Sequence, residues 1–322
     1  MRKHTTRLLL AAMTCATIGL AASQAHVAPA EFPPKPWASL AWDQEVGRIQ
    51  GNESDSEGPK AFAVDPDGGV LLLDQVNQRI LRFDASGARA GEIGLPASTF
   101  DDVEQYEGRA VLALDRLVGK RLLVLDPKGA VLVDVAVEGR GIERAGLITA
   151  MLPRPDGVWL EVQHRHSVKV LDRDLAPCER QVVVGRPIVN GRSLHAALDD
   201  RGGVKLSTRA RNERREGGEA TLVAQSPIRR IVWSDADPAG RIHVVLHEAE
   251  FATVSPYRVK SERYWMVELD EQLREVQRVA SPWVLTEYDQ RVEFRVGRDG
   301  RLWQMALTPQ GVQIVDWGRR AP

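Results

Sequence analysis

The sequence lacks the motifs of several common protein classes. Its 322 residues include only two cysteines, so no disulfide framework can hold the fold together. No CxxCH, GxSxG, HExxH or P-loop motif is present, which removes covalent haem and the commonest motif-borne serine hydrolases, zincins and NTPases. The chain also has no large excess of either sign of charge, with 43 Lys and Arg against 44 Asp and Glu. A net charge of −1 gives no long-range attraction for nucleic acid or for an anionic membrane.

A long apolar run occurs at the N-terminus, and no later stretch approaches the 18 apolar residues of a membrane span. A basic segment precedes the run Leu8–Ala22, and the small residues Ser23 and Ala25 follow it. This pattern predicts a signal peptide over residues 1–25 and an exported protein, periplasmic or extracellular. An uncleaved N-terminal anchor is the alternative. Residues 26–37 are rich in Pro and Ala and are expected to form an extended tether.

Short apolar stretches separated by turn residues recur along the rest of the chain. Residues 58–93 contain four such stretches, divided by Asp, Pro, Gly and Asn, and variations of this unit continue to residue 317. The first turn of each unit carries a glycine, at Gly68, Gly108, Gly157, Gly202, Gly240 and Gly300. This spacing straddles the ~40–50-residue period of propeller blades. No capped segment of helical period interrupts the units, which argues against a parallel α/β fold.

The count of strands at the two ends predicts how a ring would close. The sixth unit supplies three strands before the end of the chain, and an apolar stretch at Leu40–Ile49 is left over at the start. Pairing that stretch with the last unit removes an exposed sheet edge. We therefore expect residues 38–322 to form one all-β domain, a six-bladed β-propeller with four-stranded antiparallel blades closed by the N-terminal strand.

The unit Gly58–Phe83 resembles an NHL repeat. It begins with Gly-Pro and Ala63-Val64-Asp65, continues through Asp65-Pro66-Asp67-Gly68, and ends its second strand at Asp74 before Asn77-Gln78-Arg79-Ile80. Over residues 40–317 the chain resembles the TolB-like six-bladed superfamily. This resemblance implies the fold but leaves the function open, because binders, lyases, lactonases and dehydrogenases share the scaffold.

The resemblance also implies that the loops after each second strand and the starts of the first strands open on one face. The starts of the first strands carry Lys60, Glu104, His195, Arg229 and Arg291. Candidates for binding on this face are Asp115, Arg116, Glu248 and Glu250. His164, His195 and His247 come from three consecutive units and could together hold zinc, or calcium could bind in the channel. The alternative is that the three histidines are separate surface or channel residues.

Two functions follow from these candidates. The absence of a convergent catalytic motif favours a binding or scaffold module that recognises a protein or peptide, rather than a small molecule, through one face of the ring. The three histidines support the alternative, a metal-dependent lyase or hydrolase with its site at the channel mouth. The sequence identifies neither the ligand nor the oligomeric state.

Overall fold

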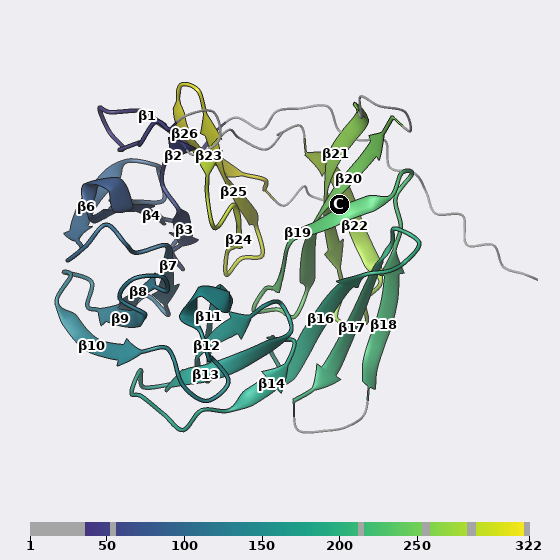
Figure 1. Ribbon diagram of the computed structural model, residues 1–322, viewed down its shortest axis with the longest axis horizontal. Helices are drawn as coiled ribbons and strands as arrows, with labels where there is room; N and C mark the ends of the chain where they lie inside the picture. The colour runs from purple at the N-terminus through teal and green to yellow at the C-terminus, as the bar shows by residue number, and fades with distance from the viewer. Residues whose placement is uncertain (1–35, 52–55, 212–215, 253–257, 282–287, 319–322) are drawn as a thin grey trace, which may run out of the picture.

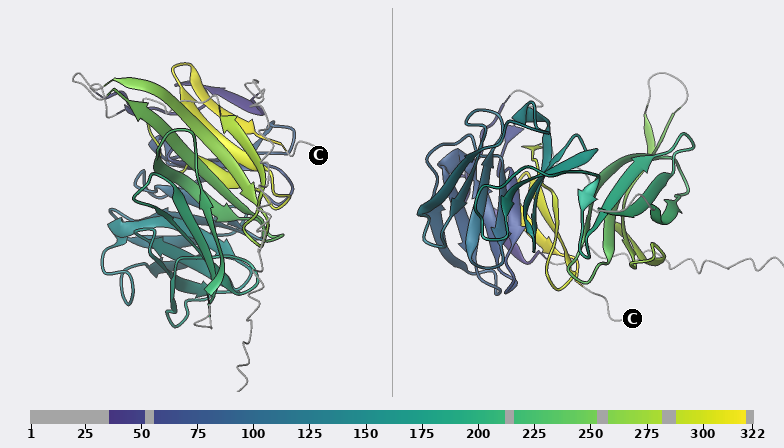
Figure 2. Two further views of the ribbon diagram at one scale, coloured as in Figure 1. Left: turned by 90° about the vertical axis from the view of Figure 1, so that its right-hand side faces the viewer. Right: turned by 90° about the horizontal axis from the view of Figure 1, so that it is seen from below.

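The computed structural model describes residues 36–51, 56–211, 216–252, 258–281 and 288–318. Six four-stranded antiparallel sheets follow one another around a ring, as the colour sequence in Figure 1 and the two turned views in Figure 2 show. Within the described residues the only helices are two 3-10 turns, η1 (Gln75–Asn77) and η2 (Ala145–Leu147). The prediction of an all-β, six-bladed propeller is confirmed. The expected signal peptide and nearly all of the expected tether lie outside the described residues.

The first three blades match the strands expected from the sequence closely. Blade one contains β3 (Ala61–Val64), β4 (Val70–Asp74), β5 (Arg79–Phe83) and β6 (Arg89–Gly94). Blade two contains β7 (Asp102–Tyr106), β8 (Ala110–Asp115), β9 (Arg121–Leu125) and β10 (Val131–Ala136). Blade three contains β11 (Ile148–Arg154), β12 (Gly157–Val162), β13 (His166–Asp172) and β14 (Val182–Val184). The agreement follows from short apolar stretches bounded by strong turn residues.

Blade four begins with a two-residue strand, and blade five contains the longest strands, of up to 11 residues. Blade four contains β15 (Arg186–Pro187), β16 (Arg192–Leu198), β17 (Val204–Ala210) and β18 (Glu216–Leu222). Blade five contains β19 (Ile228–Ala236), β20 (Ile242–Phe251), β21 (Val259–Leu269) and β22 (Glu275–Ser281). The sequence indicates only three strands for blade four, because the two residues of β15 are too few to form a recognisable pattern.

The N-terminal strand closes the ring, with one correction to its boundaries. Blade six contains β24 (Phe294–Val296), β25 (Leu302–Thr308) and β26 (Gly311–Asp316), and β1 (Ala38–Ala41) pairs antiparallel with β26. The expected strand over Leu40–Ile49 was therefore placed too far along the chain. The strand ends at Ala41 because the next residues turn, with Asp43 at a φ of 62° and its N–H donating to the Val46 carbonyl at 2.9 Å.

A second contact ties the N-terminal segment to the ring. The short strand β2 (Ser56–Glu57) pairs in parallel with β23 (Tyr288–Asp289), which lies in the long interval expected between blades five and six. The indole ring of Trp42 lies 5.0 Å from the Tyr288 ring. Trp37, at the end of the expected tether, donates its backbone N–H to the Ile314 carbonyl at 2.8 Å.

The first-turn glycines have the backbone conformation that their position requires. All six of them have positive φ, and at Gly68 the angle is 84°. The Gly68 N–H donates to the Asp65 carbonyl at 2.9 Å, and Asp65 N–H donates to the Gly69 carbonyl at 2.8 Å. Glycine adopts this region without the Cβ clash of other residues, so each turn reverses the chain tightly.

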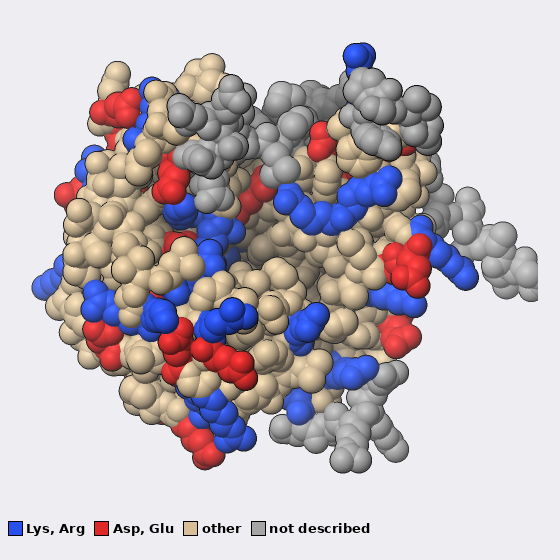
Figure 3. Space-filling model, in the orientation of Figure 1, with Lys and Arg blue, Asp and Glu red and all other residues tan. Residues whose placement is uncertain are grey.

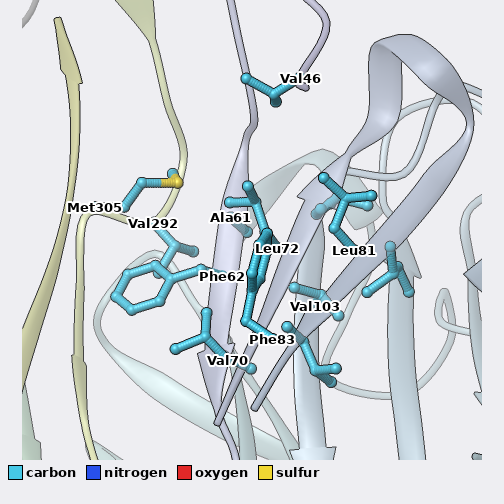
Figure 4. Close-up of a cluster of buried hydrophobic side chains, with 14 of the residues drawn as sticks. Val46, Ala61, Phe62, Val70, Leu72, Leu81, Phe83, Val103, Val292 and Met305 are labelled. Atoms are coloured by element: carbon cyan, nitrogen blue, oxygen red, sulfur yellow. The ribbon is translucent and has the colours of Figure 1, made fainter. Parts of the chain in front are cut away.

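The core lies between the faces of neighbouring blades. In Figure 4, Phe62 of blade one lies beside Val292 and Met305 on the side of blade six, Leu72 lies between, and Leu81 lies on the other side toward Val103. The three blade-one side chains are at most 1% exposed. Full burial of such side chains stabilises the fold by about 1.5–3 kcal/mol each. In the described part of the chain, no helix has the length and apolar character needed to cross a bilayer.

Candidate functional site

A cavity of about 930 Å³ lies between the inner parts of blades three to six. β11, β16, β19 and β24 all contribute to its wall, and Figure 3 shows a central hollow with Lys or Arg side chains gathered along its sides. This volume is in the range of ligand-binding pockets. The charged residues of the wall are six arginines and three carboxylates: Arg116, Arg186, Arg229, Arg230, Arg291, Arg295, Glu161, Asp235 and Glu293.

The arginines face the cavity, whereas several of their carboxylate partners lie behind the wall. Arg295 contacts Asp102 at 2.8 Å and Glu104 at 2.8 Å, and neither carboxylate belongs to the lining. Arg116 contacts Asp101 at 2.6 Å, and Asp101 is also outside the lining. The residues that line the cavity therefore carry more net positive charge than these residues and the carboxylates behind them taken together.

Two buried ion pairs join blades that are not neighbours in the ring. Arg295 of β24 pairs with Asp102 of β7, and Arg154 of β11 pairs with Asp235 of β19. In addition, Arg291 donates from Nη2 to the Ile148 carbonyl at 3.1 Å. These contacts connect the inner strands across the ring, and removing one partner would leave the other charge buried and uncompensated.

Glu161 and Arg186 form the most completely satisfied pair of the wall. Arg186 donates from Nε and Nη2 to the two carboxylate oxygens of Glu161, at 3.1 and 2.8 Å. Thr149 Oγ1 donates to Glu161 Oε2 at 2.8 Å, and His164 Nδ1 lies 2.9 Å from the same oxygen. Burial opposes ionisation of Glu161, but the charge of Arg186 and the contacts with His164 outweigh it and hold the pKa of this carboxyl well below its usual range.

Other acids near the cavity have raised pKa values. Burial is the main cause that raises the pKa of Glu104 to about 8. The charge of Arg295 lowers this pKa, and the like charges of Asp102 and Asp235 raise it further. Burial likewise raises the pKa of Asp101 to about 6, with Arg291 and Arg116 opposing the shift. Glu293 also has a raised pKa, and burial is again the main cause.

Arg291 is a buried cation without a close carboxylate. Its side chain is 8% exposed, and its Nε lies 3.6 Å from Asp102 Oδ2 and 3.9 Å from Asp101 Oδ1. This Nε makes no hydrogen bond. Burial lowers the pKa of Arg291 from its ordinary value. The guanidinium therefore retains donor capacity at the cavity wall.

Of the four residues expected to bind on the face, only Arg116 lines the cavity. Asp115 is 2% exposed and accepts hydrogen bonds from Thr99 Oγ1 and from the Val118 N–H, so it holds its own loop. Glu248 is 4% exposed and accepts from the Ser226 N–H at 2.7 Å and from the Trp265 indole. Glu250 is exposed and pairs with Lys260 at 3.0 Å.

The structure does not bring His164, His195 and His247 together. His164 lines the cavity beside Glu161, whereas His195 on β16 and His247 on β20 are not part of its lining. His247 contacts Glu262 at 2.6 Å and stacks on the Tyr264 ring at 4.8 Å. Over the described ranges, no group of three or more His, Cys, Asp or Glu side chains could hold a metal ion. Metal binding by the three histidines stays a prediction without support from this geometry.

Several wall residues carry no distinguishing pattern in the sequence. Arg229 and Arg291 were expected near this face as residues at the starts of first strands, and both line the cavity. Arg186, Arg230 and Arg295 were not expected there. Arg186 lies in the two-residue strand β15, and Arg295 lies within a strand where alternation of polar and apolar residues is equally typical of a solvated face.

Comparisons with known proteins agree with the fold. No family model matches the chain, and no curated protein matches it. Among solved structures, the hydrazine synthase of Kuenenia stuttgartiensis is similar with a TM-score of 0.52 and 12% identity, covering 84% of this chain and 80% of that chain. A member of the DUF4221 family from Bacteroides vulgatus gives 0.48 and 12%, covering 86% and 96%. A streptogramin B lyase gives 0.45 and 10%, covering 83% and 95%. At 12% identity the first likeness indicates a shared fold only. The chain is a β-propeller by its own six four-stranded sheets, and its membership of the NHL or TolB-like families stays a prediction.

Proposed function

We propose that this chain is an exported binding module that receives part of a protein or peptide partner, or a ligand, in its central cavity. The observation that carries the proposal is the cavity itself, about 930 Å³ in volume, with walls from four blades and arginines facing inward. Export rests on the basic and apolar N-terminal segment of the sequence.

The surrounding structure supports a preformed site. Ion pairs between non-adjacent blades, such as Arg154–Asp235 and Arg295–Asp102, fix the inner strands relative to one another. A site that is already formed before binding loses little conformational entropy when it is occupied. Rigid presentation of side chains from several blades is what a binding module requires.

A variant that fills the cavity tests the proposal. Ala197 on β16 lines the cavity, and Ala197→Trp would occupy part of its volume. Ala90→Trp is the matched control, since Ala90 is exposed on β6. We expect a thermal-shift screen of small molecules and short peptides to yield ligands that stabilise the wild type and the control but not Ala197→Trp. Ligands that stabilise all three proteins equally would contradict a cavity site.

A further inference from the structure

We propose that the central cavity selects an organic anion, a carboxylate attached to an apolar body, through arginines of β19 and the segment before β24. This inference rests on the proposed cavity site and specifies its ligand. The same chemistry is presented by the free C-terminus of an apolar peptide and by a free organic acid.

The charges of the cavity lining favour an anion. Six arginines line it against three carboxylates, and two of the three carboxylates already have an arginine partner. Glu161 is held by Arg186, and Asp235 is held by Arg154 from outside the lining. The third, Glu293, is largely buried, and its burial disfavours the ionised form. Arg116, Arg186 and Arg295 are already paired with carboxylates, so the positive charge open to a ligand is that of Arg229 and Arg230, which are exposed.

The strand β19 is shaped to present side chains to the cavity. All residues from Arg229 to Asp235 line it, as expected for the edge strand of its sheet, while Ile231 and Trp233 also pack against hydrophobic clusters. The pairing of β19 with β20 shifts register twice, between Ile228 and Arg230 and between Ile231 and Trp233. Such bulges bend a strand and redirect its side chains, and they are common beside functional sites. Here they place two consecutive exposed arginines, Arg229 and Arg230, at the same cavity.

One of these arginines is held in place by its surroundings. Arg229 donates from Nε to the Ala249 carbonyl at 3.0 Å, and its guanidinium lies 5.3 Å from the Phe251 ring centroid. Arg291, before β24, also lines the cavity, although its Nε is buried on the side of Asp102. Guanidinium groups bind carboxylates with two parallel hydrogen bonds, which is the strong, oriented form of this contact.

The rest of the wall suits an apolar body. Ala196, Ala197 and Leu198 of β16 line it, together with Trp233, and none of these four residues is fully buried. A small inorganic anion would leave this apolar surface in contact with water. A carboxylate on a hydrocarbon or aromatic body would contact both the arginines and the apolar surface. Burial of apolar area contributes about 25 cal/mol per Å².

Four probes test the inference in two matched pairs. N-acetyl-Leu-Phe with a free carboxylate is compared with its C-terminal amide, and 1-naphthoate is compared with 1-naphthamide, all by calorimetry or equilibrium dialysis at neutral pH and low salt. We expect at least one acid to bind ten-fold or more tightly than its amide, which corresponds to about 1.4 kcal/mol. A preference in the peptide pair alone identifies a peptide terminus, and one in the naphthyl pair alone identifies a free organic acid.

Arginine variants locate the preference. Arg230→Gln should remove most of the discrimination between acid and amide, and Arg229→Gln provides a second variant should the first fail to fold. Arg263→Gln is the matched control, because Arg263 on β21 is exposed and outside the lining, and it should leave the discrimination unchanged. Added salt should weaken the acids and not the amides.

The outcomes separate this inference from the proposed function. Equal affinities of acid and amide, both lost in Ala197→Trp, would overturn the anion inference and leave the cavity site intact. Affinities that do not change in Ala197→Trp would overturn the cavity site itself. Failure of all four probes to bind at millimolar concentration, or an unchanged acid preference in both arginine variants, would also overturn the anion inference.

Discussion

Glu104→Gln is expected to change how the stability of the protein depends on pH. Glu104 shares one guanidinium, that of Arg295, with Asp102, and its side chain is 13% exposed. Arg291 lies 3.6 Å from Asp102 as well, but at Glu104 the effect of burial outweighs the attraction of Arg295. Burial raises the pKa of Glu104 from 4.5 to about 8, so the folded protein keeps a proton that the unfolded chain has lost between these pH values.

The sign and size of the effect follow from proton linkage. Because the folded state binds more protons than the unfolded state between about pH 4.5 and 8, the contribution of Glu104 to stability falls as the pH rises. One proton corresponds to about 1.4 kcal/mol per pH unit, so the wild type should lose about 2 kcal/mol from this group between pH 6 and pH 8. Glutamine has the shape of the protonated acid and cannot ionise. The free energy of unfolding of Glu104→Gln, relative to wild type, should therefore increase by about 2 kcal/mol over that interval.

Urea denaturation at several pH values measures this difference, and the other titrating groups largely cancel between the two proteins. Glu250→Gln is the control, because Glu250 is exposed and its ion pair with Lys260 lies at the surface. The difference between this control and the wild type should stay constant over the same pH range. A constant difference for Glu104→Gln as well would refute the reasoning and show that Arg295 keeps Glu104 ionised.

Four further predictions concern stability and metal content. Gly68→Val should cost about 1–2 kcal/mol by urea denaturation, because an added Cβ would meet Arg301 and Ala85 only at ordinary contact distances of 3.5 and 3.8 Å but the φ of 84° is strained for valine; an unchanged midpoint would contradict this. Deleting residues 36–41 should expose the edge of β26 and cause unfolding or aggregation, and a truncated protein with the wild-type melting temperature would exclude closure by β1. Arg186→Met should cost about 3–5 kcal/mol, whereas adding Glu161→Leu should restore much of it; additive losses would show that the pair is not coupled. His195→Ala should leave the zinc and calcium content unchanged by elemental analysis, since the three histidines are not grouped, and loss of a stoichiometric metal would support the metal-dependent alternative.

The sequence was most informative about turns and short strands, whose conformation depends on residues adjacent in the chain. The turn at Asp65–Gly69 needs a glycine with positive φ and an aspartate that starts the reversal, and both are visible as residue types. Strands such as β4 and β8 appear as short apolar stretches between such turns, and the structure places them within about one residue of expectation. Closure by the N-terminal strand followed from counting strands, but its end at Ala41 did not, because the turn at Asp43 has no glycine or proline to mark it.

The candidate site could be predicted only in part. Arg116, Arg229 and Arg291 were expected near one face because they follow or precede recognisable strands, and all three line the cavity. Asp115 and Glu248 were expected there for the same reason, yet both are buried, Asp115 accepting from the Val118 N–H of its own loop and Glu248 from the Ser226 N–H before β19. Position along a blade gives the end of the ring at which a residue lies, but it does not give the direction of its side chain.

The sequence by itself determined the number of blades, most strand positions and the closure of the ring by the N-terminal segment, because turn chemistry and strand periodicity act over a few residues. Only the tertiary structure decided which charges meet at the centre. The register shifts of β19 direct Arg229 and Arg230 to one cavity, and the pair of Glu161 with Arg186 joins residues from β12 and β15. A shift of one residue in a strand turns a side chain to the opposite face, so convergence on a central site depends on how the blades pack and cannot be read from the spacing of residues along the chain.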